Sequence, residues 1–325
     1  MTAHARDRQP GRTDGPTRGG APVFSRSGFD RSALERGDDG LVLRLRADAS
    51  SRVLVVRGDR AQTDADGSLR YRRADEVRGD AQWAFLGRSA DGAALLAAVL
   101  DPDGPPDPDR DEEAAWTSVR TAGAHLSAQD ADALVTAVAL GRWLREAPFC
   151  PACGNPTRVR SSGWARVCDA CGREHFPRTD PAVIMTVESA SHPDRLLLGS
   201  NVLWGPDRYS CFAGFVEAGE SAEAAVAREL REEAGIAVRD VRYRSSQAWP
   251  YPRSLMLGFR AVADDDLARP DGDEIAAVRW FTRDEIGRAL RRGAWDDRTD
   301  GEGIRLPGPA SIAHRLIADW HAETA

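Results

Sequence analysis

The sequence predicts an α+β protein of about two domains, with a small cysteine-rich module between them. Short apolar segments typical of strands occur in both halves of the chain, and segments 127–145 and 222–234 have the spacing or composition of helices. The chain has 325 residues, of which 42% are hydrophobic and 29% are charged, as in a globular protein with two cores. We expect a disordered tail (1–25), an N-terminal α+β domain (26–145), the cysteine module (146–176) and a C-terminal domain (177–325).

The tail and the overall composition limit where the protein works. Segment 1–25 is rich in Arg, Pro and Gly and lacks the apolar stretch of a signal peptide. No stretch approaches the roughly 20 apolar residues of a membrane span, so we expect no membrane partner and, by elimination, a cytoplasmic location. The net charge of −7 argues against a protein that coats nucleic acid non-specifically.

The N-terminal domain contains no group of residues with a recognisable chemistry. Segments 40–45 and 51–56 predict short strands, and segments 83–87 and 93–100 continue an irregular α+β pattern. Segment 127–145 has apolar residues at helical spacing. Taken alone, this domain indicates nothing about function.

The cysteine module has the spacing of a metal site. Cys150 and Cys153 form one C-x-x-C pair, and Cys168 and Cys171 form a second pair after fourteen residues. Four thiolates form a closed tetrahedral zinc site, which is structural rather than catalytic. The alternative, redox pairs or disulfides, is disfavoured by a cytoplasmic setting. For the fifth cysteine, Cys211, we expect a buried apolar position.

A four-cysteine module can also bind nucleic acid, which defines a second class of function. The module and its flank carry several cations and one indole: Arg158, Arg160, Arg166, Arg173, Arg178 and Trp164. As the main function of the chain, a nucleic-acid-binding module is the weaker hypothesis, because it does not account for the acidic helix described next.

The C-terminal domain contains a helix with three carboxylates at one end. Strands are predicted at 182–187, 196–199, 241–245, 255–261 and 276–281, and a closing helix at 310–320. Segment 222–234 is rich in Ala, Glu and Arg, and Gly235 follows it as a left-handed stop. Glu229, Glu232 and Glu233 share one face, where their charges repel unless a cation binds. Such oxygen ligands suit Mg²⁺ or Mn²⁺, which commonly bridge carboxylates to phosphates.

The ordinary alternative is a solvated helix face on which Arg228 pairs with Glu232. Two glycines and an acidic turn precede the helix, however, and bring more carboxylates to the same end. From Gly214 to Ile236 the chain also matches the Nudix box, G-x5-E-x7-R-E-U-x-E-E-x-G-U with U aliphatic, at every specified position. The chain therefore resembles the Nudix hydrolases. This resemblance implies an α/β/α sandwich and metal-dependent cleavage of a nucleoside diphosphate linked to another group.

A second motif narrows this resemblance. Segment 246–254 reads Ser-Gln-Ala-Trp-Pro-Tyr-Pro-Arg-Ser, a stiff aromatic loop that could stack on a flat ring or form a packed turn. It is similar to the SQPWPFPxS signature of the NADH pyrophosphatase subfamily, whose members place a four-cysteine zinc ribbon before the Nudix domain. The same order of ribbon, box and loop occurs here.

The resemblance implies specific site residues. Metal ligands are expected from the carbonyl of Ala213 and from Glu229, Glu233 and Glu274, and Glu232 is expected to act as a second-metal ligand or a base. With Glu229 and Glu233, it forms the expected catalytic set. Trp249 and Phe215 are expected to sandwich the nicotinamide ring. The expected substrate contacts are Arg120, Phe176, Phe215, Gln247, Ala248, Trp249, Pro250, Tyr251, Pro252, Arg253, Ser254 and Ala313.

Three positions differ from the subfamily pattern. Ala248 replaces the first proline of the loop, Gly163 stands where some members have a substrate-contacting Glu, and Phe176 lacks the hydroxyl of the usual Tyr. None of these differences involves a metal ligand, but together they affect the ranking of substrates.

The resemblance finally implies an activity. We expect metal-dependent hydrolysis of the NAD(H) pyrophosphate to NMN(H) and AMP, removal of NAD caps from RNA 5′ ends, and a homodimer. The enzymatic alternative is a Nudix hydrolase of ADP-ribose or another nucleoside diphosphate derivative.

Overall fold

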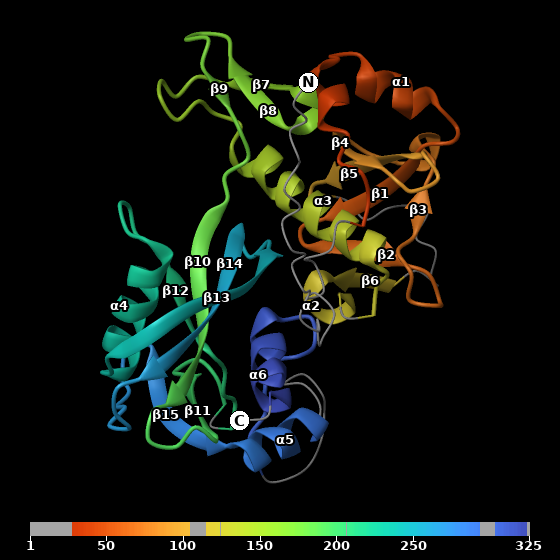
Figure 1. Cartoon of the computed structure of the whole chain (residues 1–325). Coiled ribbons are helices and arrows are strands. Elements are labelled where there is room, and N and C mark those ends of the chain that lie inside the picture. The colour runs from red at the N-terminus through yellow and green to blue at the C-terminus, as the bar shows by residue number, and fades with distance from the viewer. Residues whose placement is uncertain (1–27, 105–114, 124, 206, 293–302, 324–325) are drawn as a thin grey trace, which may run out of the picture.

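The computed structural model describes residues 28–104, 115–123, 125–205, 207–292 and 303–323, and the tail expected at 1–25 lies outside these ranges. Three sheets follow one another along the chain, and the long strand β10 leads from the small middle sheet into the C-terminal domain (Figure 1). None of the helices in the described ranges has both the length and the apolar character that a membrane crossing requires.

The N-terminal domain is a mixed sheet covered by a long helix. Its strand order is β4-β5-β1-β2-β6, with β3 paired to β1. Helix α3 begins after Ser127, whose hydroxyl accepts a hydrogen bond from the Asp130 N–H, and its buried side chains pack on the sheet. The strands are β1 (Arg52–Arg57), β2 (Arg60–Thr63), β3 (Tyr71–Arg72), β4 (Ala81–Arg88), β5 (Ala94–Leu100) and β6 (Ala115–Ser118), and the helices are α1 (Leu41–Ala47), α2 (Val119–Ala122) and α3 (Ala128–Glu146).

One predicted strand of this domain is wrong. Of the segment 40–45, residues 41–45 belong to the helix α1 rather than to a strand, and Gly40 caps that helix. The alternation of Leu41, Leu43 and Leu45 fits a strand, but Leu43 is 72% exposed, whereas Leu41 and Leu45 are buried. Two buried leucines four residues apart lie on one face of a helix, and that face packs beside β4.

The middle sheet consists of three short antiparallel strands: β7 (Thr157–Arg160), β8 (Ala165–Cys168) and β9 (Glu174–His175). Its tip packs against the N-terminal domain. The Trp164 indole N–H donates to the carbonyl of Phe85, and the guanidinium of Arg36 lies 3.7 Å from the Trp164 ring centre. The ribbon is therefore held by the N-terminal domain.

The C-terminal domain is a three-layer α/β/α sandwich. The strand order is β13-β14-β10-β11-β15, with β12 paired to β10, and α4 covers one face while α5 and α6 cover the other (Figure 1). Along β10, Val183 and Met185 pack toward α4, whereas Ile184 packs toward α6, as the two-residue period of a strand requires. The elements are β10 (Asp180–Ser189), β11 (Arg195–Asn201), β12 (Phe212–Phe215), α4 (Ala222–Ala234), β13 (Val238–Trp249), β14 (Ser254–Ala263), β15 (Ile275–Thr282), α5 (Arg283–Arg292) and α6 (Ile312–Ala322).

The aromatic segment at 246–254 is partly strand. Residues 246–249 complete β13, Trp249 pairs with Ser254 at the start of β14, and the residues between them turn the hairpin. Ala248, Trp249 and Tyr251 pack against the core of the N-terminal domain. This hairpin belongs to the C-terminal domain, and its tip contacts the N-terminal domain.

Candidate active site

Helix α4 has the bounds that the sequence predicts, and local interactions explain both ends. The Ser221 hydroxyl accepts a hydrogen bond from the Ala224 N–H at the first turn, and Gly235 stops the helix with φ +65°. Val226 and Leu230 are buried against the sheet. This packing fixes the direction in which the three glutamates of the last turns point.

Two carboxyl groups of α4, those of Glu229 and Glu233, lie largely out of solvent and close to other negative charges. Glu233 is 7% exposed, and one of its carboxylate oxygens has no hydrogen-bond partner within the described structure. Burial, together with the charges of Glu229 and Glu274, raises the pKa of Glu233 to about 8. Burial also raises the pKa of Glu229, although Arg228 opposes this shift. The site therefore favours neutralisation of its carboxylates by a proton or a cation.

Arg228 bridges three carboxylates of the site, those of Glu220, Glu229 and Glu232. Its guanidinium donates to both oxygens of Glu220 at 3.0 Å, to Glu229 at 2.8 Å and to Glu232 at 3.0 Å. It also donates to the carbonyl of Phe215 at 2.8 Å. The Arg228–Glu232 pair of the alternative hypothesis is thus present, but as one contact of a larger network that ties β12 and the acidic turn to α4.

The strand β12 brings its backbone to the same carboxylates. A β-carbon on Gly214 would overlap the carboxyl group of Glu229, so any side chain at this position would force that carboxyl group to move. Ala213 precedes it on the same strand and pairs with Ile184 of β10. The predicted carbonyl ligand is therefore adjacent to the residue that contacts Glu229.

A loop before β15 completes the acidic group. Glu274 lies in this exposed loop, and its charge contributes to the raised pKa of both Glu229 and Glu233. Asp271, which sequence reasoning missed, accepts a hydrogen bond from the Ile275 N–H at 2.9 Å and shapes the turn. Its charge also acts on Glu233. The Asp-Gly pair at 271–272 signals such a turn in the sequence.

This donor set fits a hard divalent cation. It consists of carboxylate oxygens and a neighbouring backbone carbonyl, the ligands that Mg²⁺ and Mn²⁺ prefer. The orphaned oxygen of Glu233 is a buried acceptor that a bound cation would satisfy. The roles predicted for Ala213, Glu229, Glu232, Glu233 and Glu274 stay predictions.

The predicted aromatic residues of the hairpin lie together. The ring centres of Trp249 and Tyr251 are 5.0 Å apart, and the guanidinium of Arg120 lies 4.0 Å from the Tyr251 ring centre and 5.5 Å from that of Trp249. A cleft of about 180 Å³ beside them is lined by hairpin, ribbon and N-terminal residues, including Ala248, Trp249, Pro250, Arg253, Ser254 and Trp164. The structure thus brings Arg120 to the hairpin from the other domain.

Other predicted substrate residues have different surroundings. Gln247 is buried, where its amide donates to the carbonyl of Ala310 at 2.8 Å and accepts from the Ile312 N–H at 2.7 Å. Ala313 belongs to the first turn of α6 and is buried in the core that this helix covers. Phe176 and Phe215 are 64% and 55% exposed. The exposed rings of Phe176 and Phe215 are accessible to a ligand, whereas Gln247 connects the hairpin to α6. The substrate contacts predicted for all four residues stay predictions.

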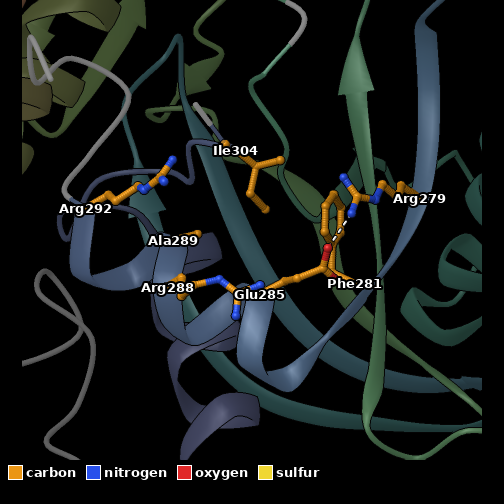
Figure 2. A pocket seen from close by; sticks show the side chains of 8 residues that line it. Arg279, Phe281, Glu285, Arg288, Ala289, Arg292 and Ile304 are labelled. Atoms are coloured by element: carbon orange, nitrogen blue, oxygen red, sulfur yellow. Dashed lines mark hydrogen bonds and ion pairs between the residues drawn. The ribbon is translucent and has the colours of Figure 1, made fainter. Parts of the chain in front are cut away.

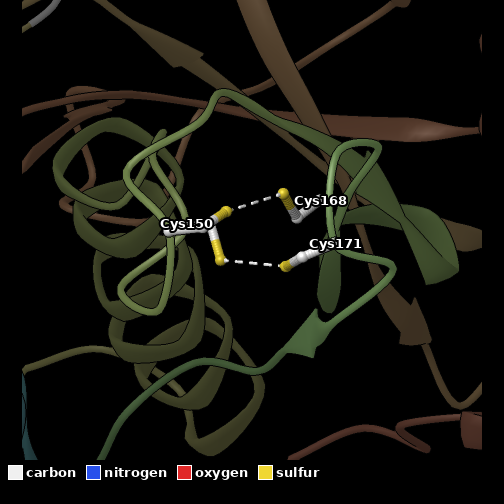
Figure 3. A group of neighbouring side chains, drawn as sticks. Cys150, Cys168 and Cys171 are labelled. Atoms are coloured by element: carbon white, nitrogen blue, oxygen red, sulfur yellow. Dashed lines mark hydrogen bonds between the residues drawn. The ribbon is translucent and has the colours of Figure 1, made fainter.

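The four cysteines form a group with the dimensions of a zinc site. The sulfurs of Cys150 and Cys171 are 3.7 Å apart, those of Cys153 and Cys168 are 3.5 Å apart, and all four lie within 4.8 Å of one another (Figure 3). A tetrahedral zinc with bonds of about 2.3 Å separates its sulfurs by about 3.8 Å. Four thiolates leave no open position for a substrate, so the site fits structural zinc.

The ribbon arginines are mostly engaged within the protein. Arg158, Arg160 and Arg178 form ion pairs with Asp169, Asp39 and Asp180, at distances of 2.5 to 2.7 Å. Arg166 is buried, and it donates to backbone carbonyls of α3 and β7. Burial removes Arg166 from contact with phosphates, whereas the side chains of Arg158 and Arg178 remain 49% and 72% exposed.

A second hollow, of about 230 Å³, lies at α5 and β15 (Figure 2). Its residues Phe281 and Ala289 pack on the sheet face opposite to α4. Its cations include Arg279, which stacks 4.6 Å from the Phe281 ring centre and pairs with Glu285. None of the predicted site residues lines it.

Comparison with known proteins agrees with this architecture. Three family models match in order: an NADH pyrophosphatase-like rudimentary NUDIX domain (31–143), the NADH pyrophosphatase zinc ribbon domain (145–176) and the NUDIX domain (178–299). The NAD-capped RNA hydrolase NudC of Mycobacterium tuberculosis (strain ATCC 25618 / H37Rv) is 42% identical over 313 residues, covering 93% of this chain and 95% of that protein.

Two further relatives match over smaller parts. The NAD-capped RNA hydrolase NUDT12 of Macaca fascicularis is 38% identical over 60% of this chain and 42% of its own length. A solved NUDIX hydrolase from Nitrosomonas europaea aligns with 49% of this chain and 97% of its own, at 24% identity and a TM-score of 0.37. With the full-length match and the three family models, the conclusion is that this chain belongs to the Nudix hydrolases, in the group that carries the NADH pyrophosphatase zinc ribbon.

Proposed function

We propose that the protein hydrolyses the pyrophosphate of NAD(H) to NMN(H) and AMP and removes NAD caps from RNA 5′ ends. The proposal rests on one relationship in the sheet. β12, which leads to the acidic group, and β14, which begins at the aromatic hairpin, pair with opposite edges of β10. Ala182 of β10 stands opposite Phe215 on one side and Met256 on the other. Two strand spacings, about 10 Å, therefore separate the metal-binding end from the hairpin strand.

Each end of this arrangement suits one part of a dinucleotide. The carboxylates of α4 and Glu274 would hold Mg²⁺ or Mn²⁺ at the pyrophosphate. A divalent cation there stabilises the charge on the phosphoryl oxygens and lowers the pKa of a bound water. Trp249 and Phe215 present aromatic surface for the nicotinamide ring, because Phe215 is exposed at the end of β12.

The relatives' names support the substrate. NudC and NUDT12 are both named NAD-capped RNA hydrolases, and NudC matches nearly the whole chain. A pocket for the nicotinamide end of free NAD(H) also accepts the same end of a capped RNA, since the cap is the dinucleotide itself. We include a homodimer in this proposal on the family resemblance, and a cytoplasmic setting as the sequence analysis expects.

The alternative substrate is ADP-ribose, which has the same pyrophosphate but no nicotinamide. Initial rates on NADH, NAD⁺, ADP-ribose and NAD-capped RNA, measured side by side with Mg²⁺ and with Mn²⁺, distinguish the two. We expect the nicotinamide-containing substrates to have the higher kcat/KM. A preference for ADP-ribose would overturn the proposal in favour of the alternative, and sedimentation of the same protein tests the dimer.

A further inference from the structure

Two cations of the N-terminal domain lie at the tip of the aromatic hairpin formed by residues 246–254. Arg120 of α2 and Arg142 of α3 both face the ring of Tyr251, at 4.0 Å and 5.4 Å from its centre. Tyr251 is half-buried, and its phenol lies near Asp59, whose charge contributes with burial to a raised pKa of the hydroxyl.

Arg142 differs from Arg120 in what it can reach. Arg120 faces both aromatic rings, whereas the ring contact of Arg142 is with Tyr251. Within the described ranges the guanidinium of Arg142 makes no hydrogen bond or ion pair, so a carboxylate does not account for the half-buried position of this side chain. Gly141 beside it lies against Val99 of β5, where an added β-carbon would come within 3.1 Å of that side chain. The backbone that presents Arg142 is therefore fixed on the sheet.

Tyr251 is coupled to Trp249 in two ways. Their ring centres are 5.0 Å apart with an interplanar angle of 54°, and the Tyr251 N–H donates to the Trp249 carbonyl at 2.8 Å. A contact that fixes the Tyr251 ring therefore also restrains the orientation of Trp249, the residue proposed to stack on nicotinamide. A guanidinium over an aromatic face is a directional, partly desolvated contact of this kind.

We infer that Arg142 is a positioning residue for nicotinamide recognition, which acts on Trp249 through Tyr251. In this role, the N-terminal domain contributes to the substrate preference of the Nudix domain without touching the metal site. This inference rests on the proposed function. It assigns a task to a domain whose sequence by itself indicates none.

The test compares the full-length wild type with Arg142→Gln, Arg142→Lys and a matched control, Arg46→Gln. Arg46 also stacks on an indole in the N-terminal domain, 4.2 Å from the Trp83 ring centre, but away from the hairpin. Arg142→Gln is expected to lower kcat/KM on NADH by roughly two- to thirtyfold, mainly through KM, as the loss of one cation–π contact predicts. Turnover of ADP-ribose should be unchanged, Arg142→Lys should restore most of the loss, and Arg46→Gln should behave as wild type.

A double-mutant cycle with Tyr251→Leu separates positioning from direct contact with the substrate. If Arg142 acts through Tyr251, Arg142→Gln has no further effect in the Tyr251→Leu background. A loss on NADH that persists in that background would overturn the inference in favour of a direct substrate contact, and an equal loss on NADH and ADP-ribose would reduce Arg142 to a structural role. Absence of NADH hydrolysis by the folded wild type would instead overturn the proposed function, and this inference with it.

Discussion

Gly214 of β12 lies so close to Glu229 of α4 that a β-carbon on the glycine would overlap the glutamate's carboxyl group. The first glycine of the box, on β12, is thus in contact with one of the acidic residues of the box, on α4. The box spacing thus reflects packing between β12 and α4 as well as the pattern of proposed metal ligands. The glycine makes room for a carboxylate beside the backbone carbonyls of β12.

Gly214→Ala is expected to displace Glu229 and to lower hydrolysis by about a hundredfold or more, the scale on which losing a charge-stabilising group slows a reaction. Initial rates with saturating Mg²⁺ or Mn²⁺ measure the effect. Gly37→Ala is a suitable control, because a β-carbon there meets nothing within 4 Å. Normal activity of Gly214→Ala would mean that Glu229 can move without consequence.

Glu233→Gln is expected to remove most hydrolysis, again by about a hundredfold or more, because an amide is a poor divalent ligand. Stability without catalytic metal should not fall, since burial already raises the pKa of this carboxyl to about 8 and disfavours its charge. Rates and thermal melts measure the two effects. Glu223→Gln, on an exposed position of the same helix, is the control. Wild-type turnover of Glu233→Gln would exclude the proposed metal role.

The ribbon is expected to hold one zinc per chain, measured by elemental analysis of protein purified without chelators. Cys168→Ser should lower the melting temperature far more than it changes kcat of the molecules that stay folded, because binding of structural zinc is coupled to folding. The loss should extend into the N-terminal domain, since Trp164 of the ribbon tip donates to Phe85 of β4. Zinc-free protein with an unchanged melting curve would contradict this prediction.

Trp249→Ala should reduce hydrolysis of NADH more than that of ADP-ribose. A stacking contact is worth about 1–3 kcal/mol, or roughly tenfold to a hundredfold in kcat/KM. The ratio of kcat/KM values on the two substrates is the observable, because it cancels general damage to the metal site. If both substrates lose equally, the hairpin is a structural turn, and the generic Nudix alternative becomes the better account.

The sequence by itself determined the parts of the site whose geometry is local. Helix α4 begins and ends where composition and Gly235 predict, and the two cysteine pairs close into one cluster, as their spacing predicts. These features depend on contacts within a few residues along the chain or on a motif read as a unit. The identity of the family followed from the same motifs.

Only the tertiary structure decided which distant residues meet. The helix at Leu41–Ala47 replaced an expected strand because burial, rather than alternation, selected its face. Gln247 became a buried link to α6, and Arg120 and Arg142 came to the hairpin from another domain. Such contacts join residues that are 63 or more positions apart, or belong to the packing of whole sheets. No local pattern encodes them, because they arise only when segments distant in the chain pack together, within one domain or between the two.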